Sequence, residues 1–159
     1  MRVSFSMKNS PTVYLASDHA GFELKEKVKE FFKKEGYEVE DCGAYKYDKD
    51  DDYPDFISKA AQAVSNDPQN SKAIILGGSG QGEAIVANKF PNVRAAVYYG
   101  KVLEIPKLTR EHNDSNILSL GARFLTDEEA FAAVKLFLQT PFSKDPRHLR
   151  RIDKIRNYE

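Results

Sequence analysis

The chain has 159 residues, which is enough for one compact domain, and its 24 Lys and Arg residues balance its 24 Asp and Glu residues. Zero net charge argues against a protein that binds nucleic acid, because such domains are usually basic, and no apolar run is long enough to span a membrane. The single cysteine, Cys42, cannot form an internal disulfide and fits a reducing, cytoplasmic environment. We expect a flexible N-terminal extension over residues 1–11 and one domain over residues 12–159.

Short apolar runs, which predict strands, alternate along the chain with segments in which apolar residues have helical spacing. The pattern predicts strands at residues 13–16, 37–42, 73–76, 94–99 and 117–120. Helices are predicted at residues 22–34, 55–66, 84–89, 101–110 (short or bent at Pro106), 126–139 and from 145 onwards, with Asp55, Thr126 and Asp145 as N-caps. Strands without clean polar–apolar alternation are typical of a sheet that is buried on both faces. The sequence therefore predicts an α/β fold, with a single doubly wound, Rossmann-like, mostly parallel five-stranded sheet and helices on both faces.

The most informative segment is the glycine-rich turn Gly77-Gly78-Ser79-Gly80-Gln81-Gly82-Glu83, which lies between a predicted strand and a predicted helix. Its four glycines let backbone N–H groups approach a ligand closely, and the helix start adds unpaired donors and a positive dipole end. The segment lacks the residues of a P-loop, the spacing of a serine-hydrolase elbow and the spacing of a dinucleotide fingerprint. The alternative is a tight turn that packs the helix on the sheet, but a single tight turn seldom needs four glycines. The hydroxyl of Ser79 and the carboxylate of Glu83 favour an anion site that also moves protons.

Ligands of such sheets bind at the carboxyl ends of the strands. This rule places Asp18 and His19, after the first strand, beside Ser79 and Glu83, after the third. Taken alone, Asp18 is equally well explained as a helix cap and His19 as an exposed loop residue. Because two separate turns supply polar groups to one edge of the sheet, we expect both residues to be functional.

Two further polar segments have less specific patterns. The segment around His112 and Asn113 precedes the fifth strand, where an oriented histidine could move protons, although a polar helix end explains it as well. Arg147 and Arg151 share one face of the last helix and suit a phosphate, although a solvated basic face is the commoner meaning. The acidic run at residues 48–52 lacks the pattern of an EF-hand and is interpreted as a solvated loop, and no cluster has zinc-ligand spacing.

Taken together, these segments resemble the type B ribose-5-phosphate isomerases, within the wider family that includes the galactose-6-phosphate isomerase subunits. The resemblance covers about residues 12–156 and is carried by Ser17-Asp18-His19-Ala20-Gly21-Phe22-x-Leu24-Lys25, Asp52-Tyr53-Pro54-Asp55, the segment 77–89, Arg110-Glu111-His112-Asn113-Asp114, Gly121-Ala122-Arg123 and Arg147-His148-x-x-Arg151. It implies an aldose–ketose isomerase without metal or cofactor, which interconverts ribose 5-phosphate and ribulose 5-phosphate through a cis-enediolate. A hexose 6-phosphate substrate, such as allose or galactose 6-phosphate, is the alternative, and a non-catalytic sugar-phosphate sensor is a further one.

The resemblance also implies a role for each site residue. One branch of the family uses a cysteine base at the position of Gly77, so Glu83 is the implied base here. Ser79 is implied to help move the proton between O1 and O2, and His112, with Asp18 nearby, to open the sugar ring. The implied substrate contacts are His19, Tyr53, Gly78, Gly80, Gln81, Gly82, Asn113 and Arg123, and the implied phosphate contacts are Arg147, His148 and Arg151. The family shares sites between subunits, which implies a homodimer or a dimer of dimers, with the C-terminal helix contributing to the partner.

Overall fold

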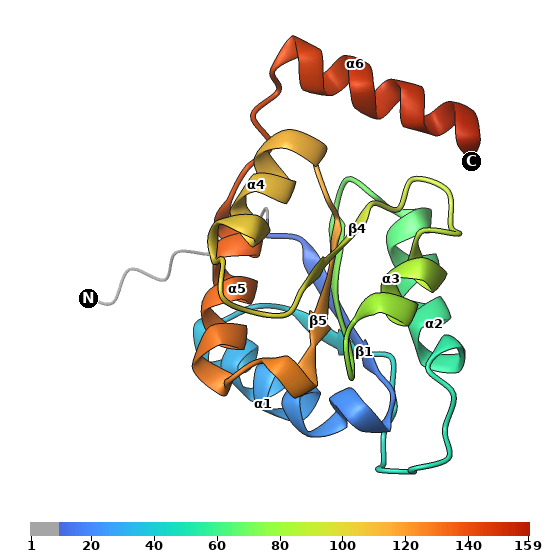
Figure 1. Ribbon diagram of the computed structural model, residues 1–159, viewed down its shortest axis with the longest axis vertical. Helices are drawn as coiled ribbons and strands as arrows, with labels where there is room; N and C mark the ends of the chain where they lie inside the picture. The colour runs from blue at the N-terminus through green and yellow to red at the C-terminus, as the bar shows by residue number, and fades with distance from the viewer. Residues whose placement is uncertain (1–9) are drawn as a thin grey trace.

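The computed structural model describes residues 10–159, which form one five-stranded sheet with helices on both faces (Figure 1). The strand order is β2-β1-β3-β5-β4, and every neighbouring pair is parallel. The strands are β1 (Thr12–Ser17), β2 (Val39–Asp41), β3 (Ser71–Gly77), β4 (Ala95–Tyr98) and β5 (Ile117–Gly121). The helices are α1 (His19–Glu35), α2 (Pro54–Asn66), α3 (Gln81–Ala87), α4 (Glu104–Asn113), α5 (Asp127–Gln139) and α6 (Pro146–Ile155), with 3-10 turns η1 (Ala122–Phe124) and η2 (Arg156–Tyr158). The predicted fold class is confirmed.

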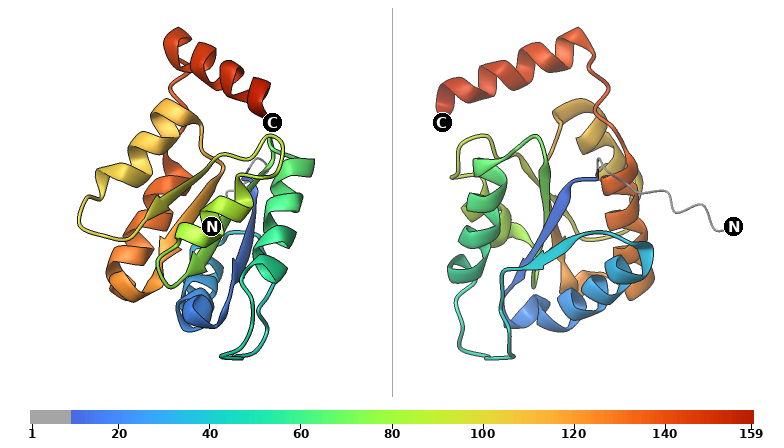
Figure 2. Two further views of the ribbon diagram at one scale, coloured as in Figure 1. Left: turned by 45° about the vertical axis from the view of Figure 1, so that its right-hand side comes forward. Right: turned by 180° about the vertical axis from the view of Figure 1, so that it is seen from behind.

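The central strand β3 shows why the strands lack polar–apolar alternation. Ile74 and Leu76 pack in a core with residues of α1 and α5, whereas Ala73 and Ile75 pack in a second core with residues of α2 and α3. Both faces of β3 are therefore buried, and its inner residues are all apolar. Figure 2 shows the two helical layers on either side of the sheet.

Because all strands are parallel, the sheet has one carboxyl edge, at the bottom in Figure 1, and one amino edge, at the top. The loops after β1, β3 and β5 meet at the carboxyl edge. Helix α6 lies at the amino edge, where it contacts α4 and stands apart from the rest of the chain (Figures 1 and 2). This separation of the two edges decides where each predicted site residue lies.

Four predicted helix starts differ from the structure, and one of them is that of α3, which begins at Gln81 rather than at 84. Helix α1 begins at His19 rather than Phe22, because Oδ1 of Asp18 accepts the N–H groups of Ala20 at 2.9 Å and Gly21 at 3.2 Å and so caps the helix. The predicted cap at Asp55 is wrong, because α2 begins one residue earlier, at Pro54, a residue that suits the first helical position. Helix α4 begins at Glu104 rather than at 101 and runs to Asn113.

The caps Thr126 and Asp145 are confirmed. Oγ1 of Thr126 accepts the N–H of Glu129, whose carboxylate accepts the N–H of Thr126, and Asp145 accepts the N–H of Arg147. Most of the predicted extension over residues 1–11 lies outside the described residues. Among the helices of residues 10–159, none has the length and apolar character that crossing a membrane requires.

Candidate active site

A pocket of about 440 Å³ opens at the carboxyl edge of the sheet, where the loops after β1, β3 and β5 meet the start of α2. It brings together residues that are far apart in the sequence: Asp18, His19, Ala20, Tyr53, Gly78, Ser79, Gly82, Glu83, Arg123 and Phe124. The expectation that Asp18 and His19 lie beside Ser79 and Glu83 is therefore confirmed. Gly80 and Gln81 belong to the same glycine-rich turn but do not line the pocket.

Glu83 lies in the first turn of α3 with its carboxylate folded back over the end of β3. The residue is only 4% exposed, and a Cβ atom on Gly77 would lie 1.8 Å from its Oε1 atom. Only a glycine at position 77 leaves room for this carboxylate. The chain therefore carries a carboxylate at the place where one branch of the resembled family carries a cysteine.

The surroundings of Glu83 make its carboxylate a stronger base than an exposed one. Burial raises the pKa of Glu83, its own backbone N–H lowers this pKa in part, and the negative charge of Asp18 raises it again. A base whose pKa is raised towards the working pH is better matched to removing a proton from carbon. Burial and the charge of Asp18 therefore make Glu83 a candidate general base.

We expect Gly77→Ala to push the Glu83 carboxylate out of this position and to destabilise the protein by about 1–3 kcal/mol, because the added methyl has no free volume. The same substitution in a Glu83→Ala background is expected to cost much less, since the clashing carboxylate is gone. Urea unfolding of the four proteins of this double-mutant cycle measures the difference. An equal cost in both backgrounds would show that Gly77 is needed for another reason.

The glycine-rich turn is fixed to the neighbouring strand. The carbonyl of Gly80 accepts a hydrogen bond from the hydroxyl of Ser119 in β5 at 2.7 Å, and the carbonyl of Gly78 accepts the N–H of Arg123 at 3.1 Å. The Arg123 side chain folds over the turn, so that a Cβ atom on Gly78 would lie 3.1 Å from its Nη1 atom. A cation therefore lies against the turn that the sequence predicts to hold an anion.

Tyr53 covers the other side of this turn. A Cβ atom on Gly82 would lie 2.6 Å from Cζ of Tyr53, so the aromatic ring lies directly against the start of α3. Ser79 lines the same pocket, and its Oγ accepts the N–H of Gln81 at 3.4 Å. The tyrosine ring thus forms one wall next to the carboxylate of Glu83.

His19 is held by a residue that sequence analysis did not select. Oδ1 of Asp51 lies 2.7 Å from Nδ1 of His19 and accepts the backbone N–H of His19 at 3.0 Å. The interpretation of residues 48–52 as a solvated loop is wrong for Asp51, because its side chain is only 7% exposed. The hydrogen bond that His19 makes to Asp51 raises the pKa of His19, burial opposes this, and the charge of Asp18 raises it further.

Asp18, His19 and Asp51 each offer a potential ligand atom, and these atoms lie within 4.8 Å of one another. Each of these contacts is explained without an ion. Nδ1 of His19 and Oδ1 of Asp51 share a hydrogen bond, and Oδ1 of Asp18 caps α1. We therefore assign no metal to this group.

The remaining predicted residues lie at the amino edge of the same chain. His112 and Asn113 end α4, just before β5, and the rings of His112 and His148 stack with centroids 4.6 Å apart. The expectation that Asp18 lies near His112 is wrong within one chain, because Asp18 follows β1 at the opposite edge (Figure 1).

The predicted phosphate contacts accompany His112 at this edge. Arg147 and Arg151 are exposed on α6, whereas His148 is buried, and burial and then the neighbouring Arg147 and His112 lower its pKa. A hollow of about 560 Å³ between α6 and the rest of the chain includes Asn113 but none of the residues that line the Glu83 pocket. One chain therefore presents two separate halves of the predicted site.

Comparisons with known proteins identify the family of this chain. The family model described as Ribose/Galactose Isomerase matches residues 13–155. A protein of Mycolicibacterium paratuberculosis named ribose-5-phosphate isomerase B is 49% identical over 147 residues, which are 92% of this chain and 91% of that protein. The crystal structure of ribose-5-phosphate isomerase B from Mycoplasma genitalium with bound ribulose-5-phosphate is 38% identical and superposes with a TM-score of 0.89, over 94% of this chain and 96% of that one. The corresponding structure from Thermotoga maritima is 42% identical, with a TM-score of 0.85 over 92% of this chain and 98% of that one. The chain belongs to the ribose/galactose isomerase family.

Proposed function

We propose that this protein is an aldose–ketose isomerase that interconverts ribose 5-phosphate and ribulose 5-phosphate. The observation that carries the proposal is the buried carboxylate of Glu83, which lies over Gly77 in a pocket that also holds Arg123 and His19, whose pKa is raised by its hydrogen bond to Asp51. Relatives named ribose-5-phosphate isomerase B, one of them with ribulose-5-phosphate bound, support the five-carbon substrate over a hexose phosphate.

The chemistry follows from the pocket. Glu83 removes the proton from C2 of the open-chain aldose, and the electron pair moves into the C1–C2 bond as the C1 carbonyl becomes an enediolate oxygen. The resemblance assigns the stabilisation of this negative charge to the amides from Gly78 to Gly82, of which Gly78, Ser79 and Gly82 line the pocket. A donor of this kind is worth about 2.7–4 kcal/mol in comparable oxyanion sites. Ser79 passes a proton between O1 and O2, and protonated Glu83 returns its proton to C1. Each bond that breaks is matched by one that forms, and no redox partner is needed.

We propose further that two chains build each site. The pocket with Glu83 contains His19 but not His112, whereas His112 and the α6 arginines lie at the amino edge, away from Glu83. Exposed apolar side chains near the pocket support a contact between chains, because Ile85, Tyr99 and Phe124 are 63%, 56% and 62% exposed. In this homodimer, or dimer of dimers, His112 of the second chain opens the sugar ring and its Arg147, His148 and Arg151 bind the phosphate.

Base, oxyanion donors and phosphate-binding cations are all protein groups, so the reaction is proposed to need neither metal nor cofactor. Cys42 is a free, half-buried thiol, which suits the proposed reducing cytoplasm. Residues 12–159 are proposed to form the isomerase domain.

A steady-state assay with ribose 5-phosphate, allose 6-phosphate and galactose 6-phosphate, each with and without a chelator, tests the proposal. We expect kcat/KM for the pentose phosphate to exceed that for either hexose phosphate by about 10²-fold or more, and to be unaffected by the chelator. Turnover of a hexose phosphate alone would replace the proposed substrate, and binding of all three without turnover would indicate a sensor.

A further inference from the structure

Asp51 reaches His19 from a loop that is 32 residues away in the sequence. One carboxylate oxygen accepts both the ring Nδ1–H and the backbone N–H of His19. The ring of Tyr47, from the same loop, stands edge-on to the imidazole with centroids 6.2 Å apart. These contacts fix the plane of the His19 ring and place the ring proton on Nδ1, or on both nitrogens, so that Nε2 is left for a ligand in the pocket.

The contact with the Asp51 carboxylate, rather than burial, favours the protonated form of His19. The side chain of Asp51 is 93% buried, and its second oxygen, Oδ2, has no hydrogen-bond partner among the described residues. A buried carboxylate is unfavourable unless a cation compensates it, and His19 is the group in direct contact with it. The charged groups that face His19 are Asp18 from the end of β1, Asp51 from the loop and Arg123 from η1. The two carboxylates favour the imidazolium, and Arg123 opposes it.

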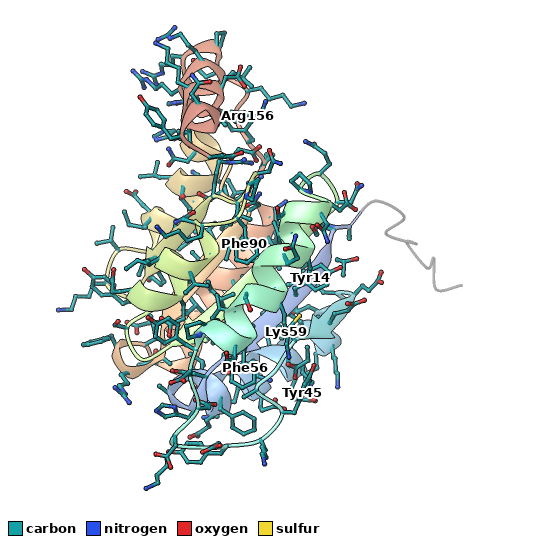
Figure 3. All side chains as sticks on the ribbon, turned by 90° about the vertical axis from the view of Figure 1, so that its right-hand side faces the viewer. Tyr14, Tyr45, Phe56, Lys59, Phe90 and Arg156 are labelled. Carbon is teal, nitrogen blue, oxygen red and sulfur yellow. The ribbon has the colours of Figure 1, made fainter. Side chains whose placement is uncertain are left out.

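The loop that carries Asp51 is anchored at its start to buried structure. Nζ of Lys25, which is fully buried in α1, donates to both carboxylate oxygens of Asp41 at 2.8 Å, and Oδ1 of Asp41 accepts the N–H of Gly43. The ring of Phe56, in α2, packs against Gly43, and the hydroxyl of Tyr45 donates to the carbonyl of Asp41. Figure 3 shows Tyr45 and Phe56 at the carboxyl-edge end of the molecule, far from Arg156 at the other end.

At its other end the loop leads directly into Tyr53 and α2, and Tyr53 is itself a wall of the pocket. Asp51 is thus held between two fixed points rather than on a free loop.

We propose that Asp51 is a positioning residue, which holds the His19 imidazolium with its Nε2–H directed at the phosphate of the sugar substrate. The inference rests on the proposed function for the identity of that anion. Arg123, which lies across the pocket against the glycine-rich turn, supplies a second cation of the same chain. His19 and Arg123 would therefore bind the phosphate from one chain while the arginines of α6 bind it from the other.

The variant Asp51→Asn keeps the shape of the side chain and removes its charge, and Asp50→Asn is a matched control because Asp50 is an exposed neighbour in the same loop. At about pH 8 we expect Asp51→Asn to raise KM for ribose 5-phosphate about tenfold and to change kcat less than about threefold, because a charge-assisted hydrogen bond to the phosphate is weakened. At about pH 6 the KM ratio should be smaller, because an imidazole without Asp51 still holds its proton there. Asp50→Asn should leave KM unchanged at both pH values.

A double-mutant cycle shows whether Asp51 acts through His19. In a His19→Ala background, Asp51→Asn is expected to change KM less than about twofold, because the group that it positions is absent. A tenfold effect in both backgrounds would overturn the proposal, and so would a KM ratio that does not vary with pH.

NMR titration of the His19 ring in the protein without substrate is independent of the isomerase activity. We expect the pKa of His19 to lie above 6.5 in the wild type and to fall in Asp51→Asn, with no change in Asp50→Asn. An unchanged pKa in Asp51→Asn would overturn the proposal even if the isomerase assay succeeds. Should Asp51→Asn not fold, the ¹⁵N shifts of His19 in the wild type decide: two protonated nitrogens at about pH 7 support the proposal, and a neutral ring contradicts it.

Discussion

Replacing Glu83 by Gln is expected to lower kcat for ribose 5-phosphate by about 10³-fold and to change KM by less than about threefold, because the amide fills the same space but cannot accept the C2 proton. The carboxylate lies in the pocket but has no role in binding the remote phosphate, so ground-state binding should survive. Steady-state kinetics of the wild type and the variant measure the effect. An unchanged kcat would remove Glu83 as the base.

The pH dependence of kcat/KM is a second test of Glu83 as the base. Glu83 must be ionised to act as a base, so activity is lost as the pH falls through its pKa. Because burial and Asp18 raise this pKa above 4.5, the acid limb of kcat/KM in the wild type should lie at a higher pH than that of an exposed carboxylate. Glu83→Asp is the matched control, because it keeps a carboxylate but moves it away from the substrate. A displacement of about 1 Å can lower the rate about 10²-fold.

Two inactive variants are expected to restore activity when they share a dimer. The first is Glu83→Gln, and the second is Arg147→Ala with Arg151→Ala. The side chains of both arginines are exposed, so their removal should leave the fold intact. In a mixed dimer, one site pairs the intact Glu83 of one chain with the intact arginines of the other. If chains assort randomly, co-expression should give about one quarter of the wild-type kcat/KM, because half of the dimers are mixed and each holds one intact site.

Each variant expressed alone serves as the control, with kcat/KM at least about 10²-fold below the wild type because phosphate binding energy or the base is lost. If co-expression gives no more activity than the two variants alone, the base and the arginines act within one chain or not in one site at all. The complementation therefore tests the shared site without any assumption about the sugar.

Local patterns in the sequence were sufficient to predict most of the fold. The alternation of apolar runs and helical spacing identified the five strands, and the caps at Thr126 and Asp145 were identified because their hydrogen bonds are made within three residues. The glycine-rich turn was recognised because its glycines are adjacent in sequence, and Gly77 and Gly82 do leave room for Glu83 and Tyr53. In each case the physical cause lies within a short stretch of chain.

Contacts that cross the fold were not predictable in the same way. The pairing of Asp51 with His19 spans 32 residues, and no local pattern distinguishes Asp51 from the exposed Asp50 beside it. The position of His112 in the fold, in contrast, could be predicted from the sequence. A segment that precedes a strand of a parallel sheet lies at the amino edge, so His112, just before β5, could not lie beside Asp18 of the same chain.

The most direct test of the proposed site is a crystal structure of the Glu83→Gln variant with ribulose 5-phosphate bound. The prediction is that the side chain of residue 83 lies about 3–3.5 Å from C1 or C2 of the sugar, with the phosphate next to His19 and Arg123 and the arginines of the second chain. A sugar bound with its C1 and C2 atoms remote from residue 83 would contradict the assignment of Glu83 as the group that removes the proton.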